Sequence, residues 1–105
     1  MKTAQITSEL LQRLRELSEK IRQNTASVSE YEEYESILIN SGAFTHDEIF
    51  DYLSRAGLGS YDALKIARDK AKTVDDRKLI EGVAVVGLVA LGLALIFSAG
   101  TSTRK

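Results

Sequence analysis

The sequence predicts an all-α protein: a small bundle of three to four short amphipathic helices, followed by a single C-terminal transmembrane helix. Apolar residues recur at helical spacing through the N-terminal part, and no stretch has the alternation of a strand with partner strands beside it. Residues 82–100 contain no charged residue, whereas all 15 acidic residues precede them. We therefore expect a soluble helical domain over residues 1–78, a transmembrane helix over 79–100 and a short polar, basic tail over 101–105.

The composition excludes several classes of protein. A chain of 105 residues has room for one compact domain and one further element. Because there is no cysteine, disulfides, thiolate catalysis and cysteine-based zinc sites are unavailable. The first residues, MKTAQITSELLQRLRE, lack the apolar run of a signal peptide, so no export signal is expected at this end.

A first helix is predicted over residues 6–24, with Thr7 or Ser8 as its cap. Its apolar residues recur at spacings of four, three and four and share one face: Leu10, Leu14, Leu17 and Ile21. The same spacing fits about two heptads of a coiled coil, but a coiled coil normally needs three or four. The face is therefore expected to form core or a groove that faces a partner.

Two overlapping capping boxes precede a second helix of about ten residues. Ser27 pairs with Glu30 and Ser29 with Glu32, and either pair can satisfy the first amide groups of a helix. The helix should end at residues 40–42, Asn-Ser-Gly.

The third helix has a signal at each end. Thr45 and Glu48 form a capping box, with Phe44 and Ile49 at the two positions of a hydrophobic staple. Gly57 is placed to take the left-handed position that ends a helix in a Schellman motif.

Ser60 caps a fourth helix whose apolar stripe is Leu64, Ala67 and Ala71. Capping can restart at Thr73, so the chain either bends there or continues as one helix into the apolar segment. The sequence leaves both open.

The apolar segment, residues 82–100, has no polar face on any side. At 1.5 Å per residue its 19 residues reach about 28 Å, close to the thickness of the hydrocarbon core of a bilayer. A core helix of this kind would need a large protein around it, so we favour a membrane span. Basic residues are concentrated on its N-terminal side: Lys65, Arg68, Lys70, Lys72, Arg77 and Lys78. The positive-inside rule then predicts a single-pass protein with its N-terminal domain on the cytoplasmic side.

Small residues of this segment fall within about 120° of one another on a helix. They are Ala84, Gly87, Ala90, Ala94 and Ser98. Such a stripe allows another transmembrane helix to approach closely, which favours a homo-oligomer or a partner helix. The alternative is that alanine and glycine are simply common in membrane spans.

Charge is unevenly distributed along the soluble part. Seven acidic residues without a lysine or arginine between them form a candidate partner surface: Glu30, Glu32, Glu33, Glu35, Asp47, Glu48 and Asp51. The basic cluster at 65–78 suits anionic lipid headgroups. The alternative is that the acidic and basic groups neutralise each other within the bundle.

The sequence offers little chemistry. His46 lies beside Asp47 and Asp51, but acidic residues in a first helical turn complement the helix dipole, and we expect no metal site. No catalytic constellation, cofactor motif or phosphate-binding loop is present. We expect no enzyme and no cofactor.

These observations favour a non-enzymatic, single-pass, tail-anchored scaffold protein. Its helical domain would dock onto partner proteins and link a membrane to a larger assembly, such as a membrane complex or the capsid of a virus with an internal membrane. A pore-forming or membrane-remodelling protein that acts through the Gly/Ala-rich helix is the main alternative. The third and fourth helices also have the outline of a DNA-binding helix-turn-helix, but Asp62 and Asp69 on the would-be recognition helix argue against nucleic acid as a partner.

Overall fold

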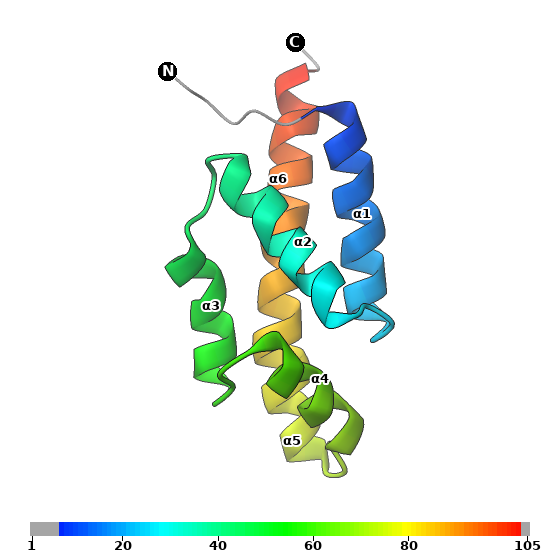
Figure 1. The fold of residues 1–105 in the computed structure, drawn as a ribbon, viewed down its shortest axis with the longest axis vertical. Coiled ribbons are helices and arrows are strands. Elements are labelled where there is room, and N and C mark those ends of the chain that lie inside the picture. The colour runs from blue at the N-terminus through cyan, green and yellow to red at the C-terminus, as the bar shows by residue number, and fades with distance from the viewer. Residues whose placement is uncertain (1–6, 104–105) are drawn as a thin grey trace.

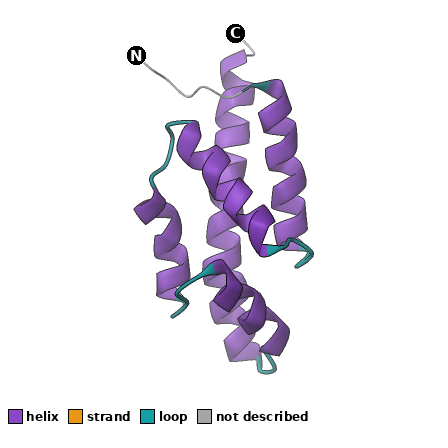
Figure 2. Cartoon of the chain, viewed as in Figure 1, coloured by secondary structure: helices purple, strands orange, loops and turns teal. Residues whose placement is uncertain are grey.

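The computed structural model describes residues 7–103, and all of the regular structure within that range is helical (Figures 1 and 2). Its elements are α1 (Ser8–Arg22), α2 (Val28–Asn40), α3 (His46–Arg55), α4 (Tyr61–Lys70), α5 (Val74–Leu79), the π-helical segment η1 (Ile80–Val85) and α6 (Val86–Thr103). Of the predicted basic tail, Arg104 and Lys105 lie outside the described residues. The predicted all-α class is confirmed.

Local capping sets where the helices begin. The side chain of Thr7 accepts a hydrogen bond from the amide of Leu10 at 3.1 Å and starts α1. Of the two overlapping boxes before α2, the chain uses Ser27 with Glu30. The capping box of Thr45 and Glu48 before α3 and the cap at Ser60 before α4 form as predicted.

Helix α3 ends in the predicted Schellman motif. Gly57 has a φ of +78°, a region that favours glycine because a Cβ atom is disfavoured there. The amide of Leu58 donates to the carbonyl of Leu53 and that of Gly57 to the carbonyl of Ser54, both at 2.9 Å. These bonds satisfy the last carbonyls of the helix and turn the chain toward α4.

The helical structure is interrupted between α4 and the apolar helix. Ala71 has an extended backbone, and the side chain of Thr73 accepts from the amide of Asp76 at 3.0 Å to start α5. From Val74 onward α5, η1 and α6 follow one another without interruption, so the apolar segment belongs to a longer helix that begins at Val74.

The π-helical turns keep one side of this long helix facing the bundle. Ile80, Ala84 and Leu88 are all buried and are four residues apart. In a regular α-helix, positions four apart drift by about 40° per step. The wider turns of η1 reduce this drift at the start of the series.

The sequence had suggested an apolar helix separate from the bundle. In the structure this helix is part of the core. Helix α6 lies along α1, with α2 and α3 also against it (Figure 1). Its side toward these helices is buried, whereas Val86 and Leu93 on the opposite side are 59% and 52% exposed. Eighty residues cannot enclose so apolar a helix, but they can cover one side of it.

The other core residues come from every amphipathic helix. The fully buried side chains outside the long helix are Leu14, Leu17, Ile21, Tyr31, Tyr34, Leu38, Ile49, Leu53 and Leu64. Three of the four residues on the predicted face of the first helix are therefore core, and Leu10 at its start is 38% exposed. This favours core packing over a coiled-coil seam.

Candidate functional site

The long helix is the only candidate membrane span in the described part of the chain. The span Val74–Ser98 has a mean hydropathy of 2.5, and 33% of its most apolar window is buried inside the protein. By length and composition it is able to cross a bilayer. We call the exposed strip formed by Val86, Ala90, Leu93 and Ala94 the outer face of α6.

The predicted stripe of small residues is divided between two sides of the helix. Ala84 is fully buried in the core, and Gly87 lies under the ring of Tyr52. Ala90, Ala94 and Ser98 are exposed, as the stripe requires. The part that remains available to another chain is therefore the C-terminal half of the stripe.

Two glycines allow tyrosine rings to lie directly against the helix backbone. A Cβ atom added at Gly87 would lie 2.2 Å from Cδ1 of Tyr52, and one at Gly92 would lie 2.1 Å from the hydroxyl oxygen of Tyr34. Real Cβ atoms do not approach other atoms so closely. These glycines are required by packing against α3 and α2, and the sequence assigned them no such role.

The Tyr34 hydroxyl contacts two backbone groups on one turn of α6. It donates to the carbonyl of Leu88 at 2.7 Å and accepts from the amide of Gly92 at 3.0 Å. These two backbone groups are four residues apart and pair with each other in a regular α-helix. Burial raises the pKa of Tyr34 to about 12, so the hydroxyl keeps its proton at neutral pH.

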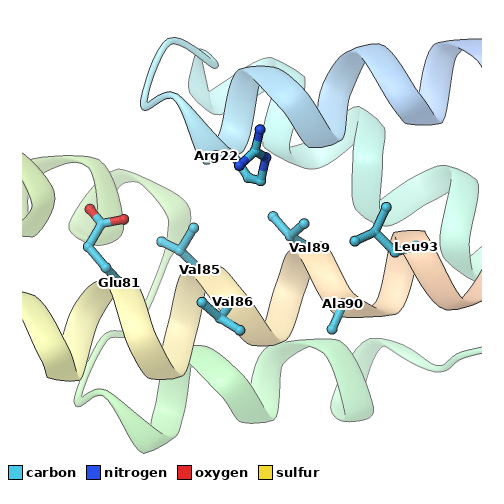
Figure 3. A pocket seen from close by; sticks show the side chains of 7 residues that line it. All are labelled: Arg22, Glu81, Val85, Val86, Val89, Ala90 and Leu93. Atoms are coloured by element: carbon cyan, nitrogen blue, oxygen red, sulfur yellow. The ribbon is translucent and has the colours of Figure 1, made fainter.

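Apolar grooves run on both sides of α6. A groove of about 410 Å³ between α1 and α6 is lined by Arg22, Glu81, Val85, Val86, Val89, Ala90 and Leu93 (Figure 3). A second hollow, of about 230 Å³, continues it past Arg15 and Glu19 to Ile96. On the other side, between α3 and α6, a groove of about 470 Å³ is bordered by Asp47, Glu48 and Asp51. We call these the α1 groove and the α3 groove.

The structure separates the six predicted membrane-proximal basic residues. Lys70, Lys72, Arg77 and Lys78 are exposed around the start of the long helix. Lys65 is half-buried and donates to the carbonyl of Ala26 at 2.9 Å. Arg68 is not at the surface, since its side chain is 2% exposed.

Arg68 joins four helical segments in the interior. Its guanidinium makes a bidentate pair with Glu81 at 2.8 and 3.0 Å. It also donates to the carbonyls of Ile21 and Arg22 at the end of α1, and to the hydroxyl of Tyr31 in α2. Arg68 therefore belongs to the fold and is not a contact for lipid headgroups.

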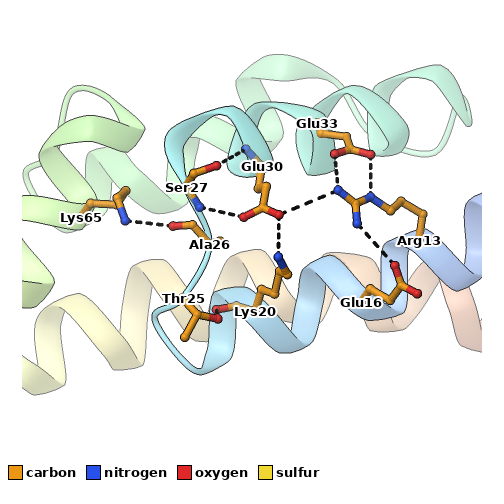
Figure 4. A network of polar contacts seen from close by, with 9 residues as sticks. All are labelled: Arg13, Glu16, Lys20, Thr25, Ala26, Ser27, Glu30, Glu33 and Lys65. Carbon is orange, nitrogen blue, oxygen red and sulfur yellow. Dashed lines mark hydrogen bonds and ion pairs between the residues drawn. The ribbon is translucent and has the colours of Figure 1, made fainter.

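The predicted acidic surface is partly neutralised within the bundle. Arg13 makes a bidentate pair with Glu33 at 2.7 and 2.8 Å, and Lys20 contacts Glu30 at 2.7 Å (Figure 4). The hydrogen bond from Arg13 lowers the pKa of Glu33, and that from Lys20 lowers the pKa of Glu30. The neutralising charges come from α1 and not from the 65–78 cluster.

Three acidic residues remain along α3: Asp47, Glu48 and Asp51. They are exposed, and Asp51 pairs with Arg55 at 2.8 Å in the same helix. Glu32 on α2 lines a separate pocket with Glu35 and His46. The acidic character available to a partner is thus greatest at the α3 groove.

His46 is paired with Glu35 across the contact between α2 and α3. Its Nδ1 is paired with Oε2 of Glu35, while the hydroxyl of Tyr61 donates to Oε1 of the same carboxylate at 2.6 Å. Among residues 7–103, no three His, Asp or Glu side chains are grouped so that they could hold a metal ion.

The hydrogen bond to Glu35 raises the pKa of His46 above its ordinary value of 6.5. A histidine whose pKa is raised by folding stabilises the fold fully below about pH 6.5, and this contribution is lost as the pH rises through the raised value. We expect NMR titration of this single histidine to give a midpoint above 6.5, and Glu35→Gln to lower it. The variant Tyr61→Phe keeps the pair and should retain the raised midpoint. Equal midpoints in wild type and Glu35→Gln would contradict the pairing.

Comparison with known proteins adds no relative. No family model, curated protein or solved structure matches the chain.

Proposed function

We propose that this chain is a non-enzymatic, membrane-anchored scaffold protein. Its long apolar helix inserts into a bilayer, and its helical bundle docks onto partner proteins of a larger assembly. The observation that supports this most is the exposed side of the long helix: a span with a mean hydropathy of 2.5 has only a third of its most apolar window covered by protein. Water is a poor environment for such a surface.

Crossing the bilayer requires α6 to leave the bundle. In the docked arrangement, Arg15, Glu19 and Arg22 of α1 and the acidic residues of α3 border the grooves beside the middle of α6. Each charge at the centre of a bilayer costs about 3 kcal/mol or more. The docked and spanning arrangements are therefore mutually exclusive.

The contacts that hold α6 can be broken without leaving the helix unsatisfied. When Tyr34 withdraws, the carbonyl of Leu88 and the amide of Gly92 can pair with each other as in a regular helix. The hydroxyl of Tyr34 then reaches water. Helix backbone in lipid must satisfy its polar groups internally, and the released α6 does so.

Release also creates a site for a partner. The bundle would expose the sides of α1, α2 and α3 that α6 had covered, including the ring of Tyr34. A groove that already holds an apolar helix suits an amphipathic helix of another protein. The exposed residues Lys70, Lys72, Arg77 and Lys78 would place this bundle on the cytoplasmic side, beside anionic headgroups.

Insertion is tested with a disulfide that locks α6 in its docked position. A Cβ atom at position 87 would lie 2.6 Å from Cγ of Tyr52, so cysteines at positions 52 and 87 are within reach of a disulfide. We expect the wild-type chain to float with anionic liposomes and to resist extraction at alkaline pH. Oxidised Tyr52→Cys/Gly87→Cys should stay extractable, and reduction should restore insertion.

The reduced double variant is the matched control, because it carries the same substitutions without the covalent bond. A wild-type chain that remains fully extractable would contradict membrane anchoring. Release of an entrapped dye from the same liposomes would instead favour the pore-forming alternative.

A further inference from the structure

The outer face of α6 is an uncharged strip one helix wide. Val86, Ala90, Leu93 and Ala94 follow one another at spacings of four, three and one, which keeps them on one side of the helix. Val86 and Leu93 are more than half exposed in the docked protein, and the alanines between them present little bulk. While α6 remains docked, this strip is in water unless something covers it.

The two borders of the strip carry opposite charge. Figures 1 and 3 show α1 and α3 on opposite sides of α6. On the α1 side, Arg22 is paired with Glu19 at 2.8 Å and Glu81 is held by Arg68, so Arg15 gives this border a net positive charge. The α3 side carries the three acidic residues of the α3 groove, of which one is paired with Arg55.

In a symmetric dimer, the orientation of the two α6 helices decides which charged borders face each other. If two copies meet through their outer faces with a two-fold axis along α6, the helices are parallel, and α1 of each copy faces α3 of the other. If the axis is perpendicular to α6, the helices are antiparallel, and α1 faces α1 while α3 faces α3. Only the parallel arrangement brings the basic border against the acidic one.

We infer that the docked, water-soluble form of this protein is a parallel homodimer that buries the outer face of α6 between two copies. Complementary borders favour this partner and disfavour the antiparallel dimer through like-charge repulsion. The inference does not depend on membrane anchoring, since it concerns the chain before any insertion.

The dimer is tested by its mass in detergent-free buffer, where light scattering should give twice the 11.6 kDa of one chain at micromolar concentration. The chain has no cysteine, so Ala90→Cys and Ala94→Cys each introduce one probe. In a parallel dimer every position on the strip meets its own copy, and both probes should form intermolecular disulfides with similar efficiency. In an antiparallel dimer only positions near the crossing point do so.

Charge reversal tests the proposed borders. Arg15→Glu and Asp47→Lys should each weaken dimerisation by about tenfold or more, and the combination of the two should restore most of the loss. Lys72→Glu, an exposed residue in the α4–α5 loop, is the matched control and should leave the dimer unchanged. A monomeric mass at 100 µM, crosslinking at one probe only, or failure of the double reversal to recover binding would overturn the inference. A monomer that partitions into vesicles would identify lipid as the cover instead.

Discussion

The substitution Gly92→Ala is expected to destabilise the docked protein by about 2–3 kcal/mol, although alanine favours helices over glycine by about 1 kcal/mol. The added Cβ would lie 2.1 Å from the hydroxyl oxygen and 2.8 Å from Cζ of Tyr34. The ring must therefore move out of the core, and its hydrogen bonds to Leu88 and Gly92 are lost. Urea denaturation followed by circular dichroism measures the loss.

Gly82→Ala is the matched control on the same helix. A Cβ atom at Gly82 meets nothing within 4 Å, so this substitution should be neutral or stabilising. Tyr34→Phe should cost less than about 1 kcal/mol, because Leu88 and Gly92 can pair with each other once the hydroxyl is gone. The double variant Tyr34→Phe/Gly92→Ala should recover part of the loss. Equal effects of alanine at positions 82 and 92 would show that Tyr34 does not pack on the helix.

The same substitution distinguishes docking from membrane insertion. In lipid, α6 no longer contacts Tyr34, and alanine at position 92 suits a helix at least as well as glycine. Gly92→Ala should therefore shift the chain toward the liposome-bound form while it weakens the soluble one. A parallel loss of both forms would mean that α6 stays docked in the membrane-bound state.

Much of the fold could be predicted because helix ends are encoded locally. Ser27, Thr45, Ser60 and Thr73 each satisfy amide groups within three residues, and Gly57 satisfies carbonyls of the preceding turn. Such signals do not depend on what the helix packs against. The break before the apolar helix was left open because the cap at Thr73 competes with a pattern that also suits continuation.

The docking of α6 could not be predicted, because no local pattern marks it. Its apolar residues surround the helix on all sides, so periodicity does not distinguish the buried side from the outer face. Tyr34 reads as an ordinary core residue of an amphipathic helix, and its partner Gly92 lies 58 positions later in the chain. Only the tertiary arrangement shows that this glycine is needed for a close approach.

Arg68 illustrates the same limit from the polar side. Within the basic run of residues 65–78 it has no distinguishing neighbour, so the sequence assigned it to the membrane surface. Its burial depends on Glu81, on the end of α1 and on Tyr31, which come from three other segments. A charged residue becomes an interior one when enough polar groups from distant segments converge on it.

We expect Arg68→Met to destabilise the protein by about 2–4 kcal/mol, because buried acceptors lose their donor. Methionine fills a similar length but donates no hydrogen bond, so the carbonyls of Ile21 and Arg22 lose a donor at the end of α1. Glu81 is 42% exposed and can be hydrated, which makes Glu81→Gln the milder change, at about 1 kcal/mol. Thermal unfolding of the two single variants and the double variant gives the coupling between the two residues.

Arg77→Met is the matched control, since Arg77 belongs to the same basic run but is exposed. Its effect should stay within about 0.5 kcal/mol of zero, as for most surface substitutions. Binding to anionic vesicles should show the opposite order of effects, with Arg77→Met the more harmful substitution. Each exposed basic residue near the headgroups contributes about 1 kcal/mol to attachment. Equal losses of stability in Arg68→Met and Arg77→Met would contradict the burial of Arg68. The hydrogen bonds of Arg68 would then not be what joins α1, α2, α4 and η1.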